Sequence, residues 1–440
     1  MPNPYLPRWE YIPDGEPRVF NNRVYVYGSH DNAGSDKFCD FKLKVWSAPV
    51  DSLNHWTCHG VSFRTRADED HESDTPWTDG ELYAPDVVEK DGKYYLYAYI
   101  FYAKGCVAVS DRPEGPFQLI SQYKVPDNSP PVLAESVFVD PGVLVDDDGR
   151  VYVYCGFEGS YMAELKASNM YEVIDGSFIP DIIPTDSPYD FFEACSLRKI
   201  GDTYYMIYSS KVGSRLVYAT SKSPRGPFEY RGVIIDNGVD YPGGNNHGSI
   251  CEINGQWYIF YHRMTNGTVM SRRACVEKIE ILPDGTIPQV EMTSLGFETS
   301  LSPYEIIPAD LACVIKGTCF ITEKNTFTRM ITNITSGCII GYKYFDFGED
   351  FGSKTMEFRA NINGFGCRAK MRILIDDYEK GEEIGCIDIG FDRGEVNTRV
   401  KSITGRHAIY FVIEDSFGGW FTDMFKGRQL FELISFVFCK

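Results

Sequence analysis

The sequence predicts an all-β protein, a five-bladed β-propeller followed by a β-sandwich of the jelly-roll type. Three observations support this fold: a hairpin motif that recurs five times, a second phrase that recurs in step with it, and the loss of both beyond Gly285. The composition agrees, because aromatic residues make up 15% of the 440 residues and helical periodicity is scarce.

The hairpin motif is a tight turn followed by an alternating, Tyr-rich strand. In residues 146–149 Asp tolerates the turn geometry and Gly accepts a positive φ, and residues 151–154 then alternate as a strand. The five copies occupy residues 21–27, 91–97, 146–154, 201–207 and 254–260. Their spacing of about 50 to 70 residues is typical of propellers or solenoids.

A second phrase repeats in step with the hairpins. Residues 110–117 read SDRPEGPF after the second copy, and residues 221–228 read SKSPRGPF after the fourth. Each unit is therefore predicted to be a four-stranded blade, and the count of five predicts the number of blades.

The length of the chain favours two domains, because 440 residues exceed one ordinary core. We expect the propeller in residues 1–300 and a second domain in residues 301–440. The blade phrase is absent from the second part, whose short alternating segments at 339–348, 370–375 and 407–412 predict a β-sandwich.

Charge and cysteine content limit the partners and the compartment. The net charge is −19 and no Lys/Arg-rich run occurs, so nucleic acid and anionic membranes are not expected partners. The thirteen Cys residues are scattered, without the paired spacing of zinc or redox motifs. The N-terminus lacks the basic and apolar regions of a signal peptide, and the expectation is a cytoplasmic protein.

Four polar residues stand in phase with the repeat. Asp14, Asp140, Glu193 and His247 each lie eight or nine positions before the turn of their copy. Because the innermost strands of a propeller line its central channel, these side chains are predicted to converge at one mouth of it. The apolar setting of Glu193 should raise its pKa and suit it to donate protons, although a structural Glu is the alternative.

His247 itself has three alternative roles: a metal ligand, a hydrogen-bond partner of a substrate, or a cap on the polar network of the channel. Other candidate residues flank the four in-phase residues. Arg263 offers a fixed cation with five donors. His30 and Asp31 follow the first Tyr-rich strand and could touch a ligand or cap a loop.

Two further residues lie near the first and second copies. Trp77 belongs to the long polar loop 64–80, where it could form the apolar wall of a sugar subsite. Asp86 stands only six residues before Gly92, out of phase with the other acids, and is predicted to be structural.

Taken in order, these motifs resemble glycoside hydrolase family 43 over residues 1 to about 300. The resemblance is carried by residues 13–19, 27–31, 83–87, 139–149 and 246–263, which read PDGEPRV, YGSHD, YAPDV, VDPGVLVDDDG and NHGS…YHR. It implies a five-bladed propeller that hydrolyses β-xylosides, α-L-arabinofuranosides or related bonds with inversion. No cofactor is implied, and a structural calcium ion is compatible with the family.

The resemblance also implies roles for the three acids. Asp14 matches the general base, Asp140 the residue that modulates the pKa of the acid, and Glu193 the general acid. The acid motif departs from the usual Glu-Gly-Pro or Glu-Ala-Pro, because Cys195 follows Ala194. Inversion requires carboxyl groups about 6.5 to 9.5 Å apart, which residues from different innermost strands can supply.

Residues from about 311 to 440 resemble a family 6 carbohydrate-binding module, with Trp420 as the candidate platform for stacking a sugar ring. The implied function is removal of xylose or arabinofuranose from hemicellulose-derived oligosaccharides. One alternative is a non-catalytic carbohydrate-binding propeller, against which the three in-phase acids count. The other is a scaffold that binds calcium through Asp and His, which leaves Glu193 without a role.

Overall fold

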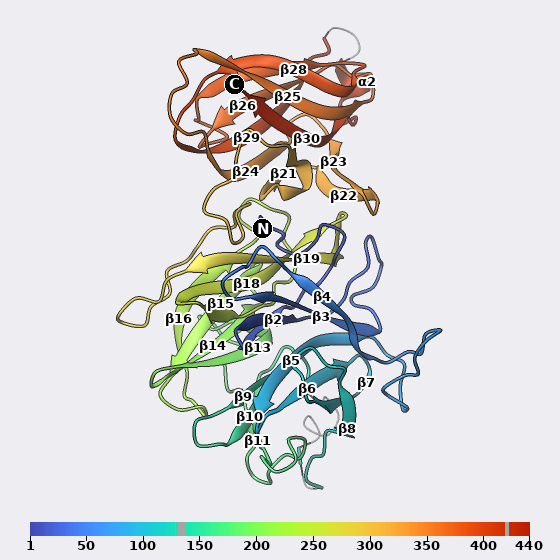
Figure 1. The fold of residues 1–440 in the computed structure, drawn as a ribbon, viewed down its shortest axis with the longest axis vertical. Coiled ribbons are helices and arrows are strands. Elements are labelled where there is room, and N and C mark those ends of the chain that lie inside the picture. Colours follow the sequence, from blue (N-terminus) through green and yellow to red (C-terminus); the bar gives the residue numbers. More distant parts are fainter. Residues whose placement is uncertain (128, 131–137, 419–421) are drawn as a thin grey trace.

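The computed structural model describes residues 1–127, 129–130, 138–418 and 422–440. Nearly all regular structure is antiparallel β-sheet, so the all-β prediction is confirmed. Figure 1 shows a larger N-terminal body, coloured blue to yellow, below a smaller C-terminal body in orange and red.

Five separate sheets form the N-terminal body, and each uses consecutive strands. The first contains β1 (Glu16–Phe20), β2 (Arg23–Tyr27), β3 (Lys42–Pro49) and β4 (Thr57–Arg64). The second contains β5 (Leu82–Lys90), β6 (Lys93–Ile100), β7 (Ala103–Ser110) and β8 (Gln118–Gln122). The third contains β9 (Gly142–Val145), β10 (Val151–Cys155), β11 (Tyr161–Leu165) and β12 (Ile179–Pro180). The fourth contains β13 (Phe191–Ile200), β14 (Thr203–Ser210), β15 (Arg215–Ser221) and β16 (Glu229–Asp236), and the fifth β17 (Ile250–Ile253), β18 (Gln256–Thr265) and β19 (Thr268–Ile279).

The repeated hairpin motif forms the first two strands of every one of these sheets. Each Tyr-rich stretch is the second strand, namely β2, β6, β10, β14 or β18, and pairs antiparallel with the strand before it. The turn residues adopt the left-handed conformation that the motif requires, with φ of 80° at Gly149 and 58° at Gly201. The predicted hairpins are therefore confirmed.

The first strands of the five sheets approach one another at the centre of the body. β1 contacts β5 and β17, and β9 contacts β5 and β13. Asp86 on β5 pairs with Arg18 on β1 at 2.6 Å and accepts a hydrogen bond from Val143 N on β9 at 2.7 Å. Asp86 therefore links three sheets, which is the structural role predicted for it.

The C-terminal body contains two antiparallel sheets. One contains β22 (Phe320–Asn325), β23 (Thr328–Ile334), β30 (Phe431–Cys439), β25 (Thr355–Gly364) and β28 (Arg393–Lys401), with β20 (Ile307–Pro308) paired to β30. The other contains β21 (Val314–Lys316), β24 (Ile339–Asp346), β29 (Arg406–Asp415), β26 (Ala369–Ile375) and β27 (Glu383–Ile389). Buried aromatic residues of both sheets, among them Phe358, Phe411 and Phe436, share one core. Two short helices, η1 (Ala309–Leu311) and α2 (Thr422–Phe425), complete the described elements.

A continuous apolar core joins the two bodies. The cluster that fills the C-terminal sheets also includes Ile259 and Cys275 of the fifth N-terminal sheet. At its edge the fully buried Asp310 of η1 pairs with Arg273 of β19 at 3.2 Å. Because core and ion pair both cross the boundary, the two bodies are packed together rather than joined by a free linker.

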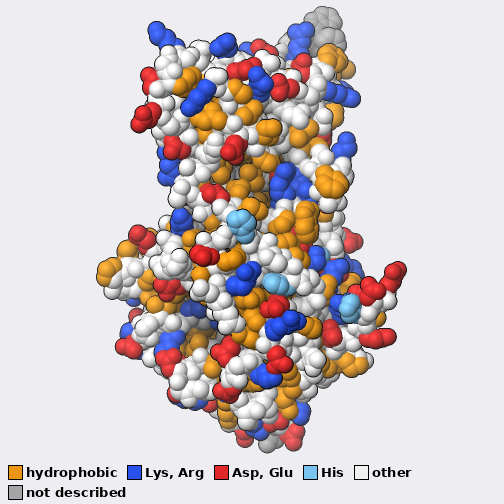
Figure 2. All heavy atoms as spheres, viewed as in Figure 1, with side chains coloured by type: hydrophobic (Ala, Val, Ile, Leu, Met, Phe, Trp, Pro, Cys, Tyr) orange, Lys and Arg blue, Asp and Glu red, His pale blue; other side chains and the backbone are white. Residues whose placement is uncertain are grey.

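The surface carries charges of both signs. On the face seen in Figure 2, Lys and Arg side chains are scattered among Asp and Glu side chains over both bodies. The positive charge of this face is therefore dispersed rather than gathered into one patch. No helix in the described part of the chain is long and apolar enough to cross a membrane.

Candidate active site

A cavity of about 620 Å³ lies at the beginning of the first strands of the N-terminal sheets. It is lined by Asp14, Phe38, Cys39, Tyr83, Tyr99, Phe101, Val139, Asp140, Phe157, Phe192, Glu193, Ser209, Ser210, Lys211, Gly213, Gly244, Asn245, Asn246, His247 and Arg272. The structure thus brings together the four residues that stand in phase with the repeat.

The backbone is unusual where the acids occur. Asp14 and Asp140 have positive φ values of 56° and 49°, a conformation that costs free energy in non-glycine residues. At Glu193 the pairing of β13 with β14 shifts register on both sides, and Ala194 has a φ of 67°. Such bulges re-aim a side chain relative to regular pleating, so the chain departs from ideal strand geometry at all three acids.

Asp14 is held in its charged form. Its Oδ1 lies 2.8 Å from Arg272 Nη1, and its Oδ2 accepts a hydrogen bond from Ser29 Oγ at 2.7 Å. Burial alone would raise the pKa of Asp14, but Arg272, two His residues and Ser29 outweigh it and lower the pKa to about 2. A buried carboxylate that stays ionised is suited to accept a proton.

Glu193 is held in the opposite state. Burial raises its pKa, the negative charge of Asp14 raises it further, and the result is a pKa of about 7. The charge of Arg272 and, to a smaller extent, the neighbouring Asn245 amide act in the other direction and lower the pKa. Glu193 is therefore mostly protonated below neutral pH, which suits the role of proton donor predicted for it.

Asp140 and His247 lie beside these two carboxyl groups. His247 Nδ1 is 3.6 Å from Asp14 Oδ1 and 3.7 Å from Asp140 Oδ2. Burial and the negative charges of Glu193 and Asp14 raise the pKa of Asp140 well above its ordinary value. Burial lowers the pKa of His247, so the imidazole is neutral and able to hydrogen-bond in the cavity.

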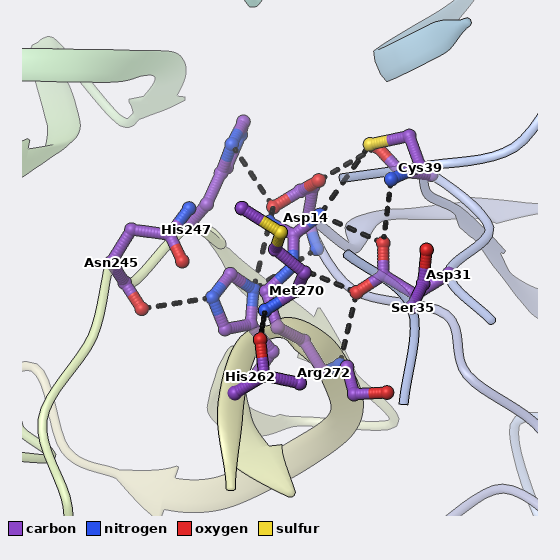
Figure 3. Close-up of polar contacts among 12 residues, drawn as sticks. Asp14, Asp31, Ser35, Cys39, Asn245, His247, His262, Met270 and Arg272 are labelled. Carbon is purple, nitrogen blue, oxygen red and sulfur yellow. Dashed lines mark hydrogen bonds and ion pairs between the residues drawn. The ribbon is translucent and has the colours of Figure 1, made fainter. Parts of the chain in front are cut away.

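Arg272 is a site residue that the sequence motifs do not identify. It lies on β19, lines the cavity and pairs with Asp31 through Nε at 2.9 Å as well as with Asp14. Figure 3 shows Arg272 together with these two carboxylates. Asp31, predicted to contact a ligand or cap a loop, accepts a hydrogen bond from the Cys39 N–H of its own loop at 3.1 Å and fixes the Arg272 guanidinium. It is not among the cavity-lining residues.

Arg263, predicted from the sequence to be the cation of the site, lies elsewhere. It is fully buried, donates from Nη2 to the Asn3 carbonyl at 3.0 Å and packs against the Tyr241 ring. Arg263 pairs in register with Arg273 across β18 and β19, whereas Arg272 is the neighbouring residue on β19. Because side chains alternate between the faces of a strand, Arg272 faces the cavity and Arg273 faces the C-terminal body. The alternation puts one arginine of this pair on the cavity side of β19, but it does not by itself show which one.

His30 and Trp77 also lie outside the cavity lining. His30 contacts Glu10 Oε1 at 3.1 Å and Asp40 Oδ2 at 3.3 Å, so its ring nitrogens are occupied within the protein. Trp77 packs against the core of the first two sheets and donates to the Lys104 carbonyl at 3.1 Å. Both residues support the fold in this structure. Trp420, the predicted stacking platform of the C-terminal body, lies outside the described residues.

Aromatic side chains form the walls of the cavity. Tyr83 and Phe101 stack at 5.2 Å between ring centroids, and Phe157 and Phe192 approach to 5.0 Å. These rings, rather than Trp77, supply the apolar surface on which a sugar face can pack. They lie at strand ends and in loops, where sequence periodicity does not show which side chains converge.

The described residues contain no group of three or more His, Cys, Asp or Glu side chains arranged to hold a metal ion. His247 Nδ1 approaches one oxygen each of Asp14 and Asp140. The role of His247 as a metal ligand and a structural calcium ion stay predictions.

A cavity that holds an ionised carboxylate and a protonated carboxyl group defines an enzyme of the general acid–base class, and its aromatic walls are suited to sugars. Comparison with known proteins gives the family. The family model described as "Glycosyl hydrolases family 43" matches residues 14–287. The chain belongs to this family and is a glycosidase.

Sequence alignments with similar proteins cover most of this chain. A protein described as "Xylosidase/arabinosidase" from Thermoclostridium stercorarium is 39% identical, with 94% of this chain and 96% of the relative covered. A "Beta-xylosidase" from Xylanibacter ruminicola is 32% identical and covers 64% of this chain and 97% of its own length.

Solved structures of family 43 enzymes also superpose on this chain. A family 43 β-xylosidase/α-arabinofuranosidase from a compost microbial metagenome, solved with xylotriose in a calcium-free form, superposes with a TM-score of 0.54 at 29% identity and covers 66% of this chain and 99% of its own. An arabinoxylan arabinofuranohydrolase from Bacillus subtilis, solved with cellotetraose, covers 100% of this chain and 97% of its own with a TM-score of 0.57. Its identity of 24% makes this second likeness one of fold alone.

Proposed function

We propose that this enzyme removes xylose or arabinofuranose from the ends of hemicellulose-derived oligosaccharides, with inversion at the anomeric carbon. The observation that carries the proposal is a buried and a partly buried carboxyl group that line one cavity with opposite protonation. Asp14 has a pKa of about 2 and Glu193 a pKa of about 7. The relatives named for xylosidase and arabinosidase activities support the choice of pentose.

The reaction follows from these two protonation states. Asp14 takes a proton from a water molecule while the water oxygen bonds to the anomeric carbon. Glu193 gives its proton to the glycosidic oxygen while the bond to the anomeric carbon breaks. After the step Asp14 is neutral and Glu193 is ionised, so one exchange of protons with solvent restores the enzyme.

Neighbouring residues prepare these groups. Arg272 keeps Asp14 ionised and, as a cavity-lining cation, can donate to sugar hydroxyl groups. Asp140, buried beside Glu193, disfavours ionisation of the acid when it is itself charged, because like charges raise each other's pKa. His247 completes the polar floor of the cavity.

We also propose that the five N-terminal sheets are the blades of a five-bladed propeller in residues 1–300, and that residues 301–440 are a β-sandwich resembling a carbohydrate-binding module. The contacts among β1, β5, β9, β13 and β17 support the first, and the core shared by two sheets supports the second. A crystal structure with four or six blades would overturn the propeller.

Short substrates are proposed because of the expected location. All thirteen cysteines are unpaired, which is consistent with a reducing cytoplasm. In that compartment the substrates are imported oligosaccharides rather than polymeric hemicellulose.

A panel of aryl glycosides tests the proposed function. We expect turnover of aryl β-xyloside, aryl α-L-arabinofuranoside or both, and release of the same monosaccharide from the corresponding oligosaccharides. Aryl glucosides and galactosides serve as controls. If no pentoside is hydrolysed while pentose oligosaccharides still bind, the enzyme proposal is wrong and the carbohydrate-binding alternative replaces it.

A further inference from the structure

His262 joins the two sides of the active site without lining the cavity. It lies on β18, is almost completely buried, and both of its ring nitrogens are occupied. Nδ1 accepts a hydrogen bond from the backbone N–H of Asp14 at 3.2 Å. Nε2 lies 3.0 Å from the backbone carbonyl of Asn245. Figure 3 shows this imidazole between Asp14 and Asn245.

The partners determine the tautomer of the ring. The Asp14 N–H can only donate, so Nδ1 must be unprotonated, and the Asn245 carbonyl can only accept, so Nε2 must carry the proton. A second proton, on Nδ1, would lie against the Asp14 N–H, so Nδ1 could no longer accept this hydrogen bond. The protonated Nδ1 would instead be attracted to Asp14 Oδ1, which lies 3.4 Å from it. Burial and the charge of Arg272 lower the pKa of His262 to about 3, so the ring stays neutral.

Each partner is connected to one catalytic group. Asp14 has a left-handed backbone, with a φ of 56°, and the hydrogen bond to its N–H stabilises that conformation where the general base projects. Asn245 lies in the loop before β17, and its side-chain amide lies close enough to the Glu193 carboxyl to lower the pKa of that group. The imidazole therefore spans from the backbone of the base to the backbone of the residue that contacts the acid.

The surroundings hold this bridge in place. The backbone carbonyl of His262 accepts a hydrogen bond from Asn237 Nδ2 at 2.6 Å, and the Asn245 loop is fixed by a hydrogen bond from Ser214 Oγ to the Gly244 carbonyl at 2.7 Å. Besides Asp14, the ionisable groups facing the ring are Arg272 and His247. The ring has no free nitrogen with which to touch a substrate.

We propose that His262 is a positioning residue. It holds Asp14, the general base, and Asn245, the residue beside the general acid, at a fixed separation. The inference rests on the proposed roles of Asp14 and Glu193. It goes beyond them because it assigns a different role to each ring nitrogen. Nδ1 positions the base, and Nε2 positions the loop that contacts the acid. A shift of about 1 Å in such groups can lower the rate about 10²-fold.

Two substitutions separate the roles of the two nitrogens. In His262→Asn the side-chain oxygen replaces Nδ1 and can still accept from the Asp14 N–H, but nothing reaches the Asn245 carbonyl. In His262→Gln the amide nitrogen replaces Nε2 and can still donate to that carbonyl, but the Asp14 N–H loses its acceptor. Each variant is assayed on an aryl pentoside with an activated leaving group and on an oligosaccharide with a poor one.

We expect different substrate patterns from the two variants. His262→Gln disturbs the base, so kcat/KM should fall about 10²-fold on both substrates. His262→Asn disturbs the acid, so kcat/KM should fall about 10²-fold on the oligosaccharide but less than about 5-fold on the activated substrate. The exposed His59, which contacts Ser47 Oγ at 2.7 Å, provides the control variant His59→Gln, which should behave as wild type.

The ratio of rates on the two substrates does not depend on the amount of folded enzyme, so partial misfolding cannot produce the expected contrast. Equal losses on both substrates in both variants would overturn the proposal and leave a purely structural His262.

Independently, nitrogen NMR of wild-type enzyme with labelled histidine should show the His262 ring neutral and protonated on Nε2 throughout the working pH range. A charged or Nδ1-protonated His262 in that range would also overturn it. Activity of the wild type on either substrate shows separately that the proposed function stands.

Discussion

The Arg272 guanidinium bridges two buried carboxylates, with Nη1 2.8 Å from Asp14 Oδ1 and Nε 2.9 Å from Asp31 Oδ2. Asp31 lies next to His30 just beyond the first hairpin, and Arg272 lies 241 residues later on β19. One cation thus fixes Asp14, the proposed general base, to the last sheet of the N-terminal body. Among the neighbours that lower the pKa of Asp14, Arg272 has the largest effect.

Replacing Arg272 by Met should therefore change the pH dependence of the enzyme. Without this cation, burial dominates and the pKa of Asp14 rises from about 2. A neighbouring opposite charge shifts a carboxyl pKa by about 1 to 3 units, so the acidic limb of the kcat/KM profile should move to higher pH by about that amount. Arg272→Lys keeps the charge and should move it less. Arg372→Met, which removes an ion pair with Glu383 in the C-terminal body, is the control and should leave the profile unchanged.

Glu193→Gln should discriminate between leaving groups. Gln keeps the shape of the side chain but cannot donate a proton as an acid does, so hydrolysis of natural oligosaccharides should fall by about 10² to 10⁴-fold. Activated aryl glycosides, whose leaving group needs no proton, should lose much less. The measurement is kcat/KM on a series of aryl pentosides of graded leaving-group pKa. The exposed Glu252→Gln serves as the control, and an equal loss across the series would show that Glu193 is not the acid.

Asp14→Asn should behave differently, because a good leaving group cannot replace a base. We expect a loss of about 10² to 10⁴-fold on activated and natural substrates alike. Azide needs no deprotonation to attack, so adding it should restore turnover of the aryl substrate and yield a glycosyl azide. Near-normal hydrolysis by Asp14→Asn without azide would contradict the assignment.

Asp140→Asn tests the coupling between the buried carboxyl groups. The charge of Glu193 raises the pKa of Asp140, and the effect of two charges on each other is reciprocal. Removing the carboxyl should lower the pKa of Glu193 and move the basic limb of the pH–rate profile to lower pH. An unchanged basic limb would mean that Asp140 stays protonated at working pH and does not act through Glu193.

Much of this site is predictable from the sequence because turns and strand phase are local properties. The hairpin turns around Gly149 and Gly201 place Asp140 and Glu193 at corresponding positions, and both line the cavity together with Asp14. The repeat therefore predicts which positions converge.

The remaining residues depend on contacts that no local pattern encodes. Arg272 and Arg273 are neighbours on one strand, and only the packing of β19 against the C-terminal body decides which faces the cavity. His262 and Arg263 present the same ambiguity on β18, since the sequence does not show which of them faces Asp14. The aromatic walls, such as Phe157, come from segments whose spacing carries no period.

The stereochemistry of hydrolysis tests the central claim most directly. If Asp14 activates a water molecule on the face opposite Glu193, the sugar released first must have the anomeric configuration opposite to that of the substrate. Proton NMR of the reaction in D₂O, with the aryl pentoside that is hydrolysed fastest, follows the first-formed anomer before mutarotation. The account predicts α-xylose from a β-xyloside, or the β anomer from an α-L-arabinofuranoside. A product that first retains the configuration of the substrate would contradict it, because retention requires a covalent intermediate on one of these carboxylates.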